Sequence, residues 1–363
     1  MHFSRLQLTN FTVFEDATFD FCPGINVLIG ANGTGKSHVL KAAYAVQNCC
    51  DAFSRSFNGP VKSGEDRSLN EILPSVGVHL EEVFHATASQ LVREAKLIPL
   101  DNPARNGFSQ NGMSFFLTTI NETASFRIGI SDLGMDEAPC VFIPSREFLA
   151  AYEGYIAAYT KRESAFDRTY FDLCVQLSAS RLRGAAAEWG KLISEKVESE
   201  LPGRVELKDG RFYIGVHQAQ VVAEGHRKLA TLAHLLRNGG IDAGTTLYWD
   251  EPEAGLNPRL VKLVADVLFL LADNGVQVVI ATHDYLLTHE LSVAVEYQAT
   301  KTPVRFFCLT RDTQTAPVSI QMGETLTDLD HNPILEEFAA LYDRELSLFY
   351  GVQQTITSAG GAS

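Results

Sequence analysis

The segment Gly30-Ala-Asn-Gly-Thr-Gly-Lys-Ser37 constrains this chain more than any other feature. It matches the phosphate-loop pattern G-x-x-x-x-G-K-[ST], in which backbone N–H groups surround a bound phosphate. An apolar run, Ile25–Ile29, precedes it, and a helix-like run, Ser37–Val46, follows it. A strand, a glycine-rich loop and a helix N-terminus in this order form an anion site. The alternative is a glycine-rich turn that carries Lys-Ser by chance.

The positions of this loop have different expected roles. Its glycines allow a phosphate to approach the backbone closely and allow positive φ angles. Lys36 is expected to reach the β- and γ-phosphates of ATP, and Ser37 to be a ligand of Mg²⁺. The expected nucleotide-binding residues of this segment are Asn32, Gly33, Thr34, Gly35, Lys36 and Ser37.

A second segment, Thr246–Glu251, is an apolar run that ends in two acids. A buried parallel strand of this kind ends at the crevice where α/β sheets bind ligands. Asp250 is expected to hold the Mg²⁺ shell, largely through water. Glu251 is expected to orient and polarise the attacking water as a general base. The alternative is a strand whose terminal acids only cap the start of a helix.

A third segment, Val276–Asp284, is another apolar run, and it leads into His283. A histidine at this strand end can donate a hydrogen bond to the γ-phosphate or to the attacking water. A single histidine at such a place is otherwise an ordinary polar terminus. Because it follows the two motifs above, we interpret His283 as a second catalytic residue beside Glu251.

Together the three motifs resemble those of ABC-type ATPases. The stretch Val222–Ala230 stands where that superfamily carries its signature loop. Gly225 matches the signature glycine, whereas Ala223 replaces the usual serine and Glu224 the first glycine. This variant, with Asp250-Glu-Pro-Glu-Ala-Gly-Leu-Asn-Pro258, resembles the AAA-15/AAA-21 group, relatives of the SMC, RecF and overcoming-lysogenization (OLD) ATPases. The resemblance is good at both ends of the chain and poor between about Cys50 and Val221.

The resemblance implies a homodimer in which two heads enclose two ATP molecules. The signature segment of one copy would then face the phosphate loop of the other. On this basis Glu224, Gly225 and Arg227 are assigned to the nucleotide across the interface, and Asn257 to the turn that crosses between the two sites. The alternative for the signature segment is a plain helix N-terminus with an acid that suits the macrodipole, and both interpretations can hold together.

Composition restricts the class of protein further. The net charge is −14, which argues against a broad surface that coats nucleic acid but leaves a local basic groove open. No run is long and apolar enough to cross a bilayer, no signal peptide is visible, and the six cysteines show no C-x-x-C spacing. We therefore expect a cytoplasmic protein with reduced thiols and no membrane partner.

The expected fold is an α/β P-loop NTPase with an ABC-ATPase-like head, an antiparallel β-subdomain and an inserted helical lobe. Residues 1–145 are predicted to hold the first lobe and 146–222 the helical lobe with a hairpin. Residues 223–350 are predicted to hold the signature, acidic and histidine segments, and 351–363 a disordered tail. Helices are expected at 36–48, 285–294 and 333–346, and a loop with a short helix at 54–79.

One polar segment, Ser145-Arg-Glu147, stays open between two interpretations. By the resemblance, Arg146 and Glu147 stand near the γ-phosphate or Mg²⁺. Alternatively, Ser145 caps the helix that follows.

The function most consistent with these features is that of an ATPase that dimerises around ATP and regulates a separate, nuclease-like effector in prokaryotic anti-phage defence or DNA maintenance. A RecF-like repair ATPase that binds DNA itself is the first alternative. A transporter nucleotide-binding subunit is the second.

Overall fold

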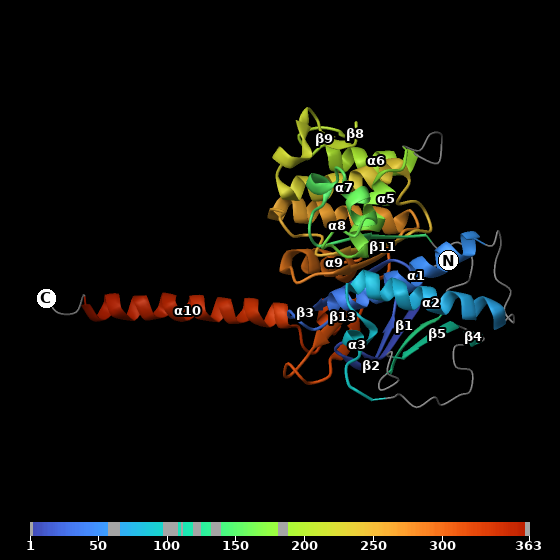
Figure 1. The fold of residues 1–363 in the computed structure, drawn as a ribbon. Coiled ribbons are helices and arrows are strands. Elements are labelled where there is room, and N and C mark those ends of the chain that lie inside the picture. The colour runs from blue at the N-terminus through green and yellow to red at the C-terminus, as the bar shows by residue number, and fades with distance from the viewer. Residues whose placement is uncertain are drawn as a thin grey trace.

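The centre of the molecule is a mixed sheet of six strands in the order β14-β13-β3-β12-β11-β7 (Figure 1). All neighbours are parallel except β14, which pairs antiparallel with β13. The strands are β3 (Ile25–Gly30), β7 (Cys140–Ile143), β11 (Thr246–Asp250), β12 (Gln277–Ala281), β13 (Val304–Thr310) and β14 (Ser319–Gly323). The computed structural model describes residues 3–56, 66–96, 108–109, 112–118, 125–131, 139–180 and 188–359.

This sheet brings the three predicted motifs to one edge. Strands β3, β11 and β12 are buried along their whole length, as their continuous apolar runs predict. Since β12 pairs in parallel with both β3 and β11, the carboxyl ends of all three lie side by side. Ligands of open α/β sheets bind at this edge. The sheet therefore carries the phosphate loop, the acidic pair and the histidine segment to the same place.

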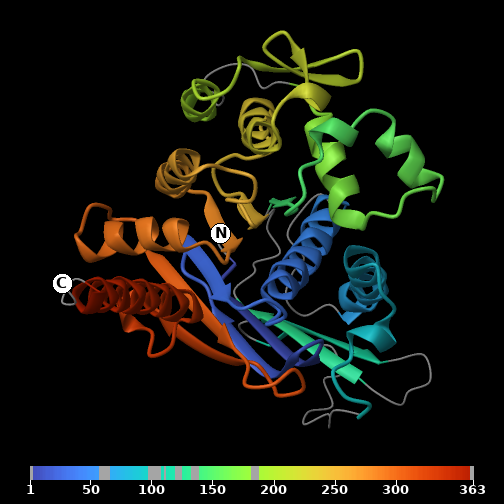
Figure 2. The ribbon, with the colours of Figure 1, turned by 90° about the vertical axis from the view of Figure 1, so that its left-hand side faces the viewer.

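A five-stranded antiparallel sheet, β2-β1-β6-β5-β4, forms the predicted β-subdomain. Helix α1 (Lys36–Ser56) lies beside it, and side chains of both join one apolar cluster with one face of the central sheet. Figure 2 shows α1 between the helical elements and this sheet. The strands are β1 (Arg5–Phe11), β2 (Phe14–Asp20), β4 (Phe108–Ser109), β5 (Gly112–Thr118) and β6 (Ser125–Ser131). Alternating apolar and polar residues at 113–120 and 123–130 predict a β-hairpin. The pairing of β5 with β6 confirms it, although the Asn121-Glu122 turn lies outside the described residues.

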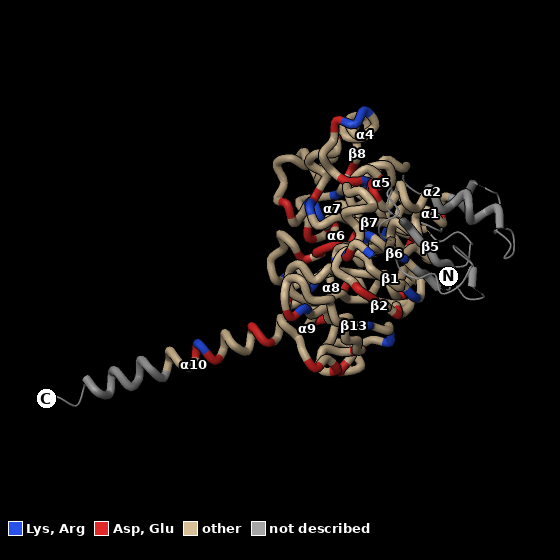
Figure 3. Tube along the Cα trace, turned by 60° about the horizontal axis from the view of Figure 1, so that its bottom comes forward, with Lys and Arg blue, Asp and Glu red and all other residues tan. Residues whose placement is uncertain are grey.

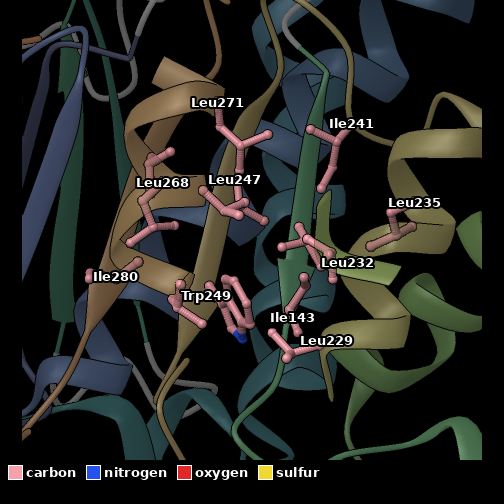
Figure 4. Close-up of a cluster of buried hydrophobic side chains, with 14 of the residues drawn as sticks. Ile143, Leu229, Leu232, Leu235, Ile241, Leu247, Trp249, Leu268, Leu271 and Ile280 are labelled. Atoms are coloured by element: carbon pink, nitrogen blue, oxygen red, sulfur yellow. The ribbon is translucent and has the colours of Figure 1, made fainter. Parts of the chain in front are cut away.

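The opposite face of the central sheet is covered by helices, and a second apolar cluster fills the space between them. Figure 4 shows Leu229 and Leu232 of the signature helix near Ile143 and Trp249, with Leu268 of the next helix beside Ile280. The covering helices are α5 (Arg168–Leu177), α6 (Glu188–Glu198), α7 (Glu224–Asn238), α8 (Pro258–Asp273) and α9 (Tyr285–Glu296). Burial of both sheet faces explains why a parallel arrangement is stable here.

The helical lobe is divided into shorter pieces than the continuous helical spacing of residues 165–200 suggests. It contains η1 (Leu149–Ala151), α4 (Tyr155–Thr160), α5 and α6. The three-stranded sheet β10-β9-β8 follows and ends at η3 (Ala219–Val221). The predicted hairpin is confirmed as β8 (Val205–Lys208) and β9 (Arg211–Ile214), and β10 (His217–Gln218) extends it. Asp209 and Gly210 form its turn with positive φ angles.

Several helices are longer than the sequence predicts. Helix α1 continues to Ser56 instead of ending at 48, and α2 (Asp66–Phe84) occupies much of the region predicted as a loop. Helix α3 (Ala88–Leu91) is a single turn after it. Packing explains the difference, because α1 contacts α2 and α2 contacts α5. Tertiary contacts of this kind override weak local propensity.

The last helix, α10 (Pro333–Ala359), also differs from the prediction. It continues past Leu346 through most of the segment predicted to be a disordered tail. Figure 1 shows it projecting from the body of the molecule, and Figure 2 views it nearly along its axis. A short turn, η4 (Leu326–Asp328), precedes it. The division of the chain into four segments otherwise stays a prediction.

Within the described part of the chain, no helix combines the length and apolar character that a bilayer crossing requires.

Candidate nucleotide-binding and hydrolysis site

The phosphate loop connects β3 directly to α1, as its sequence predicts. Gly30, Gly33 and Gly35 have φ angles of 146°, 81° and 92°, which residues other than glycine rarely adopt. At Gly35 a Cβ atom would lie 2.6 Å from Cγ2 of Val13, so the β1–β2 turn also requires glycine there. At Gly33 a Cβ would meet nothing within 4 Å, so this part of the loop faces open space. Local backbone geometry therefore builds the loop that the pattern predicts.

Lys36 lies inside this loop. Its ammonium donates hydrogen bonds to the carbonyl oxygens of Gly30 and Ala31, at 2.7 and 3.0 Å. The side chain is buried, and this burial lowers the pKa of Lys36, while nearby carboxylates partly offset the effect. A compact positive charge held at the centre of the loop suits a bound phosphate.

Ser37 and Asp250 meet at the end of β11. The hydroxyl of Ser37 donates to Oδ1 of Asp250 over 3.1 Å, although the two residues are 213 positions apart. Burial raises the pKa of Asp250, whereas the Ser37 hydroxyl lowers it. A hydroxyl and a carboxylate supply the oxygen ligands that Mg²⁺ prefers, and Mg²⁺ at such sites takes its other ligands from phosphates and water. Among the described residues no group of three or more His, Cys, Asp or Glu side chains is placed to hold a metal. The hydroxyl of Ser37 and the carboxylate of Asp250 are oxygen donors that fit a nucleotide-bound Mg²⁺.

Glu251 follows Asp250 and has an uncommon backbone conformation, with φ at 47°. Its N–H donates to the carbonyl of Ala281 on β12. Nδ1 of His283 lies 3.6 Å from Oε1 of Glu251, and both side chains are partly exposed, at 53% and 37%. The structure thus brings the two predicted catalytic residues together at the solvent-facing edge of the sheet.

Glu253, which the sequence motifs do not assign to the site, lies close to it in the structure. Its side chain is buried, and Oε1 accepts a hydrogen bond of 2.7 Å from the hydroxyl of Thr282. Within the described residues, Oε2 has no hydrogen-bond partner. Burial raises the pKa of Glu253, and Nδ1 of His283 lies 3.9 Å from Oε1. The sequence signal for this role was the position of Glu253, two residues after Glu251. A carboxylate buried at such a place needs a hydrogen-bond partner.

The signature segment begins helix α7, with Ala223 at its N-cap and Glu224 in its first turn. Gly225 packs directly on the turn after β11. A Cβ at this position would lie 2.4 Å from the carbonyl oxygen of Gly255 and 2.8 Å from Cδ2 of Leu256. Gly225 therefore has a structural reason to be glycine within a single copy of the chain. Its predicted contact with a nucleotide across a dimer stays a prediction.

Arg227 makes its contacts inside the same chain. Its guanidinium donates to the carboxylate of Glu147 and, over 2.5 Å, to the carbonyl of Val222. The side chain of Glu147 is only 1% exposed, and burial raises its pKa while Arg227 lowers it. The assignment of Arg227 to a nucleotide on another copy stays a prediction, and it requires this buried ion pair to open.

The open question about residues 145–147 is answered in part by the same contacts. Glu147 also accepts a hydrogen bond from the N–H of Leu149, so its carboxylate both caps η1 and holds Arg227. Phe148, not Ser145, is the N-cap of that turn. Arg146 is exposed.

Two further polar residues of the motifs cap helices. Asn257 accepts a hydrogen bond from the N–H of Leu260 at the start of α8, and Asp284 accepts one from Leu287 at the start of α9. N-caps of this kind fix where a helix begins. Both helices therefore start at defined positions directly after the Glu251 and His283 segments.

Two family models match parts of the sequence. One is described as an AAA domain, putative AbiEii toxin, Type IV TA system, and matches residues 192–288. The other is described as an AAA domain and matches residues 5–62. The first model spans the signature, acidic and histidine segments, and the second spans the phosphate loop.

The curated relatives include DNA replication and repair proteins RecF. The one from Flavobacterium johnsoniae is 38% identical over 71 residues, which is 18% of each chain. The one from Edwardsiella ictaluri is 23% identical over 52% of this chain and 55% of its own length. A DNA double-strand break repair Rad50 ATPase from Halobacterium salinarum is 46% identical over 12% of this chain and 5% of its own length. The matches thus span about half of these relatives or far less.

Solved structures with a similar fold include the SMC head domain from Thermotoga maritima. It is 13% identical, with a TM-score of 0.41, over 88% of this chain and 98% of that one. A Smc head with an extended coiled coil from Pyrococcus furiosus, bound to the C-terminal domain of ScpA, is 12% identical, with a TM-score of 0.44, over 94% and 99%.

The family models and the RecF and Rad50 relatives confirm the predicted resemblance to ABC-type ATPases of the SMC and RecF group. The fold class is also the predicted one, an α/β P-loop protein with an ABC-ATPase-like head.

Proposed function

We propose that this chain binds ATP with Mg²⁺ and hydrolyses it. The contact between Ser37 and Asp250 carries the proposal, because it joins the phosphate loop to the acidic strand end at one site. Glu251 and His283 lie beside this contact and supply a general base and a hydrogen-bond donor. The similarity to a protein named DNA double-strand break repair Rad50 ATPase supports the same activity.

The residues of this chain divide the work of hydrolysis. The loop N–H groups and Lys36 would hold the phosphates, and Ser37 and Asp250 would hold Mg²⁺, which would supply neutralisation of phosphate charge. Glu251 accepts a proton from a water whose oxygen attacks the γ-phosphorus. The bond from that phosphorus to the β-phosphate oxygen breaks, and ADP takes the electron pair. His283 donates a hydrogen bond to the γ-phosphate or to the attacking water.

The proposal extends to an ATP-bound homodimer in which Glu224 and Gly225 face the nucleotide of the other copy. The N-terminus of α7, a helix of 15 residues, offers free N–H groups and a positive dipole end for this purpose. Arg227 would join only after leaving Glu147. Binding to two copies at once would make assembly depend on ATP.

The Glu251→Gln variant tests the proposal. It should bind ATP as tightly as the unaltered chain, hydrolyse it at least about 100-fold more slowly, and accumulate as a dimer, since the proton acceptor is lost and the contacts remain. Phosphate release and light scattering with ATP and Mg²⁺ measure both effects. Undiminished hydrolysis would refute the role of Glu251, and a variant that stays monomeric with saturating ATP would refute the enclosed dimer.

The biological role that we propose is control of a separate effector by ATP-driven closure, in anti-phage defence or DNA maintenance. The description of the first family model, which names a toxin of a toxin–antitoxin system, supports defence. The nuclease-like nature of the effector is part of this proposal. Purification of the tagged chain from its native cells with ATP, followed by native mass spectrometry, identifies a bound partner.

A second candidate, a DNA-binding repair ATPase, is favoured by the RecF relatives. The charge of −14 weighs against extended phosphate contacts. In the view of Figure 3, Lys and Arg residues of the described elements are interspersed with Asp and Glu residues. The basic pair Arg181 and Arg183 lies outside the described residues. DNA-stimulated hydrolysis at moderate salt that disappears on charge reversal of this pair would select this candidate.

A further inference from the structure

Lys228 is a buried lysine on the signature helix, one position after Arg227. Only 1% of it is exposed, although the ammonium group of lysine is strongly hydrated in water. Its Nζ donates a hydrogen bond of 2.6 Å to the backbone carbonyl of Glu251. The residue therefore connects the helix that starts at Glu224 to the backbone of the proposed general base.

The carbonyl that Lys228 holds belongs to a backbone that needs support. Glu251 has a left-handed φ of 47°, a conformation that is unfavourable for a residue with a side chain. Its N–H is bound to Ala281, and its carbonyl also accepts from the N–H of Ala254, at 3.1 Å. Lys228 thus links this peptide to helix α7, whereas Ala281 belongs to β12 and Ala254 to the turn after β11.

The surroundings of Lys228 explain how a lysine is tolerated there. Burial lowers the pKa of Lys228, and the negative charges of Glu253, Glu251, Glu224 and Asp250 raise it in turn. A methionine or leucine would fill similar space without this desolvation cost. Lysine at this position is therefore explained by its hydrogen bond and its acidic neighbours rather than by packing.

A second contact joins the same two segments. Gly225, one helical turn before Lys228, approaches Gly255 so closely that a Cβ would lie 2.4 Å from its carbonyl oxygen. The start of α7 and the turn from Asp250 to Asn257, which we call the catalytic turn, are therefore tied at both ends.

We infer that Lys228 is a positioning residue, which fixes the carboxylate of Glu251 for hydrolysis through its backbone and makes that position depend on the placement of α7. The inference deepens the proposed ATPase function and rests on it. Lys228 acts through the backbone carbonyl of Glu251, to which its Nζ donates a hydrogen bond.

The Lys228→Met variant removes the donor and keeps the length of the side chain. We expect kcat to fall about tenfold or more, with KM and the Kd for ATP changed by less than about twofold. Without nucleotide, hydrogen exchange at the amide of Ala254, followed by mass spectrometry of peptides from the catalytic turn, should become about tenfold faster. Exchange in β1 and β6 should not change.

Two variants control this experiment. Lys191→Met removes an exposed lysine of α6, 3.8 Å from Glu195, and should change neither kcat nor exchange. Lys228→Arg keeps a charged N–H donor and should restore most of kcat and the slow exchange. If Lys228→Met does not fold, Lys228→Gln, which keeps a neutral donor, takes its place in the comparison with Lys228→Arg.

Unchanged exchange and kcat in the donor-free variant would overturn the inference. So would an equal loss of ATP affinity and of kcat, because it would assign Lys228 to binding rather than to positioning. A chain that hydrolyses no ATP would refute the proposed function alone, since the exchange measurement needs no nucleotide and still decides whether Lys228 holds the catalytic turn.

Discussion

Lys36 has its ammonium on two carbonyls of the phosphate loop, where a bound phosphate would meet a concentrated positive charge. The Lys36→Ala variant should bind ATP at least about 100-fold more weakly, because charge-assisted hydrogen bonds to phosphate are lost. Isothermal titration calorimetry with ATP and Mg²⁺ measures the change. Lys262→Ala on α8, which removes an exposed lysine paired with Asp266, is the matched control and should bind normally. Full affinity in the Lys36 variant would refute the phosphate-loop assignment.

Contacts of Gly225 inside its own chain limit what a substitution at this position can show about a dimer interface. By the resemblance, a Gly225→Asp substitution is predicted to spare ATP binding and to block dimer closure. In the structure the Cβ of that aspartate would collide with the carbonyl of Gly255. Any side chain at this position therefore disturbs the catalytic turn of its own copy, and lost dimerisation would not locate the signature segment at an interface.

At the scale of elements, α10 contrasts with the helices that cover the sheet. The beginning of α10 packs on the body of the molecule: Ile334 and Leu335 lie against the apolar cluster, and the ring of Phe338 lies 4.3 Å from that of Tyr285. From Leu341 to Phe349 every residue is exposed except Leu346, which is half-buried. The helix therefore contributes little to the folding free energy beyond its first two turns.

Removal of residues 341–363 should consequently leave the thermal midpoint within about 2 °C of that of the full chain, because no buried apolar contact among the described side chains is lost. Differential scanning calorimetry measures it. As a comparison, replacement of both Ile334 and Leu335 by alanine should lower the midpoint by about 4 °C or more. A large drop on truncation would contradict the prediction and would mean that the exposed part of α10 is packed against another surface in solution.

The strands were predictable and several helix lengths were not. Each central strand is a short apolar run bounded by turn residues, and burial on both faces keeps that signal strong. Helix α2 instead depends on contacts with α1 and α5 that come from distant parts of the chain. The sequence of α2 contains Gly77 and Pro74, which argue locally against a long helix.

At the scale of the whole molecule, folding is linked to pH through His38 on α1. Burial lowers its pKa from 6.5 to about 4, and the charge of Lys41 adds to the effect. A histidine with a lowered pKa in the fold is protonated first in the unfolded chain. Its contribution to stability is therefore fully present above about pH 6.5 and is lost as the pH falls towards 4.

The unaltered chain should accordingly lose roughly 2 kcal/mol relative to a His38→Gln variant between pH 7 and pH 4.5. Urea unfolding at both pH values measures the difference. The comparison with the variant is needed because burial raises the pKa values of Asp250, Glu253 and Glu147, and raised carboxyl pKa values stabilise the fold as the pH falls. Equal pH dependence of the two chains would show that His38 is not held neutral by the fold.

The sequence by itself determined the parts of the site that depend on consecutive residues. Positive φ angles follow from the spacing of Gly30, Gly33 and Gly35, and the acids of β11 follow from the strand that precedes them. Parallel pairing of buried strands was sufficient to predict that Ser37 and Asp250 meet.

Only the tertiary structure decided which side chains the signature helix offers to its own chain. Arg227 contacts Glu147, which is 80 positions away in the sequence, and Lys228 contacts the carbonyl of Glu251, which is 23 positions away. In the sequence both are basic residues at the start of a predicted helix, and the resemblance assigns Arg227 to a nucleotide across a dimer interface. Their roles depend on burial and on contacts with distant parts of the chain. Both arise only when the helix packs in the folded protein.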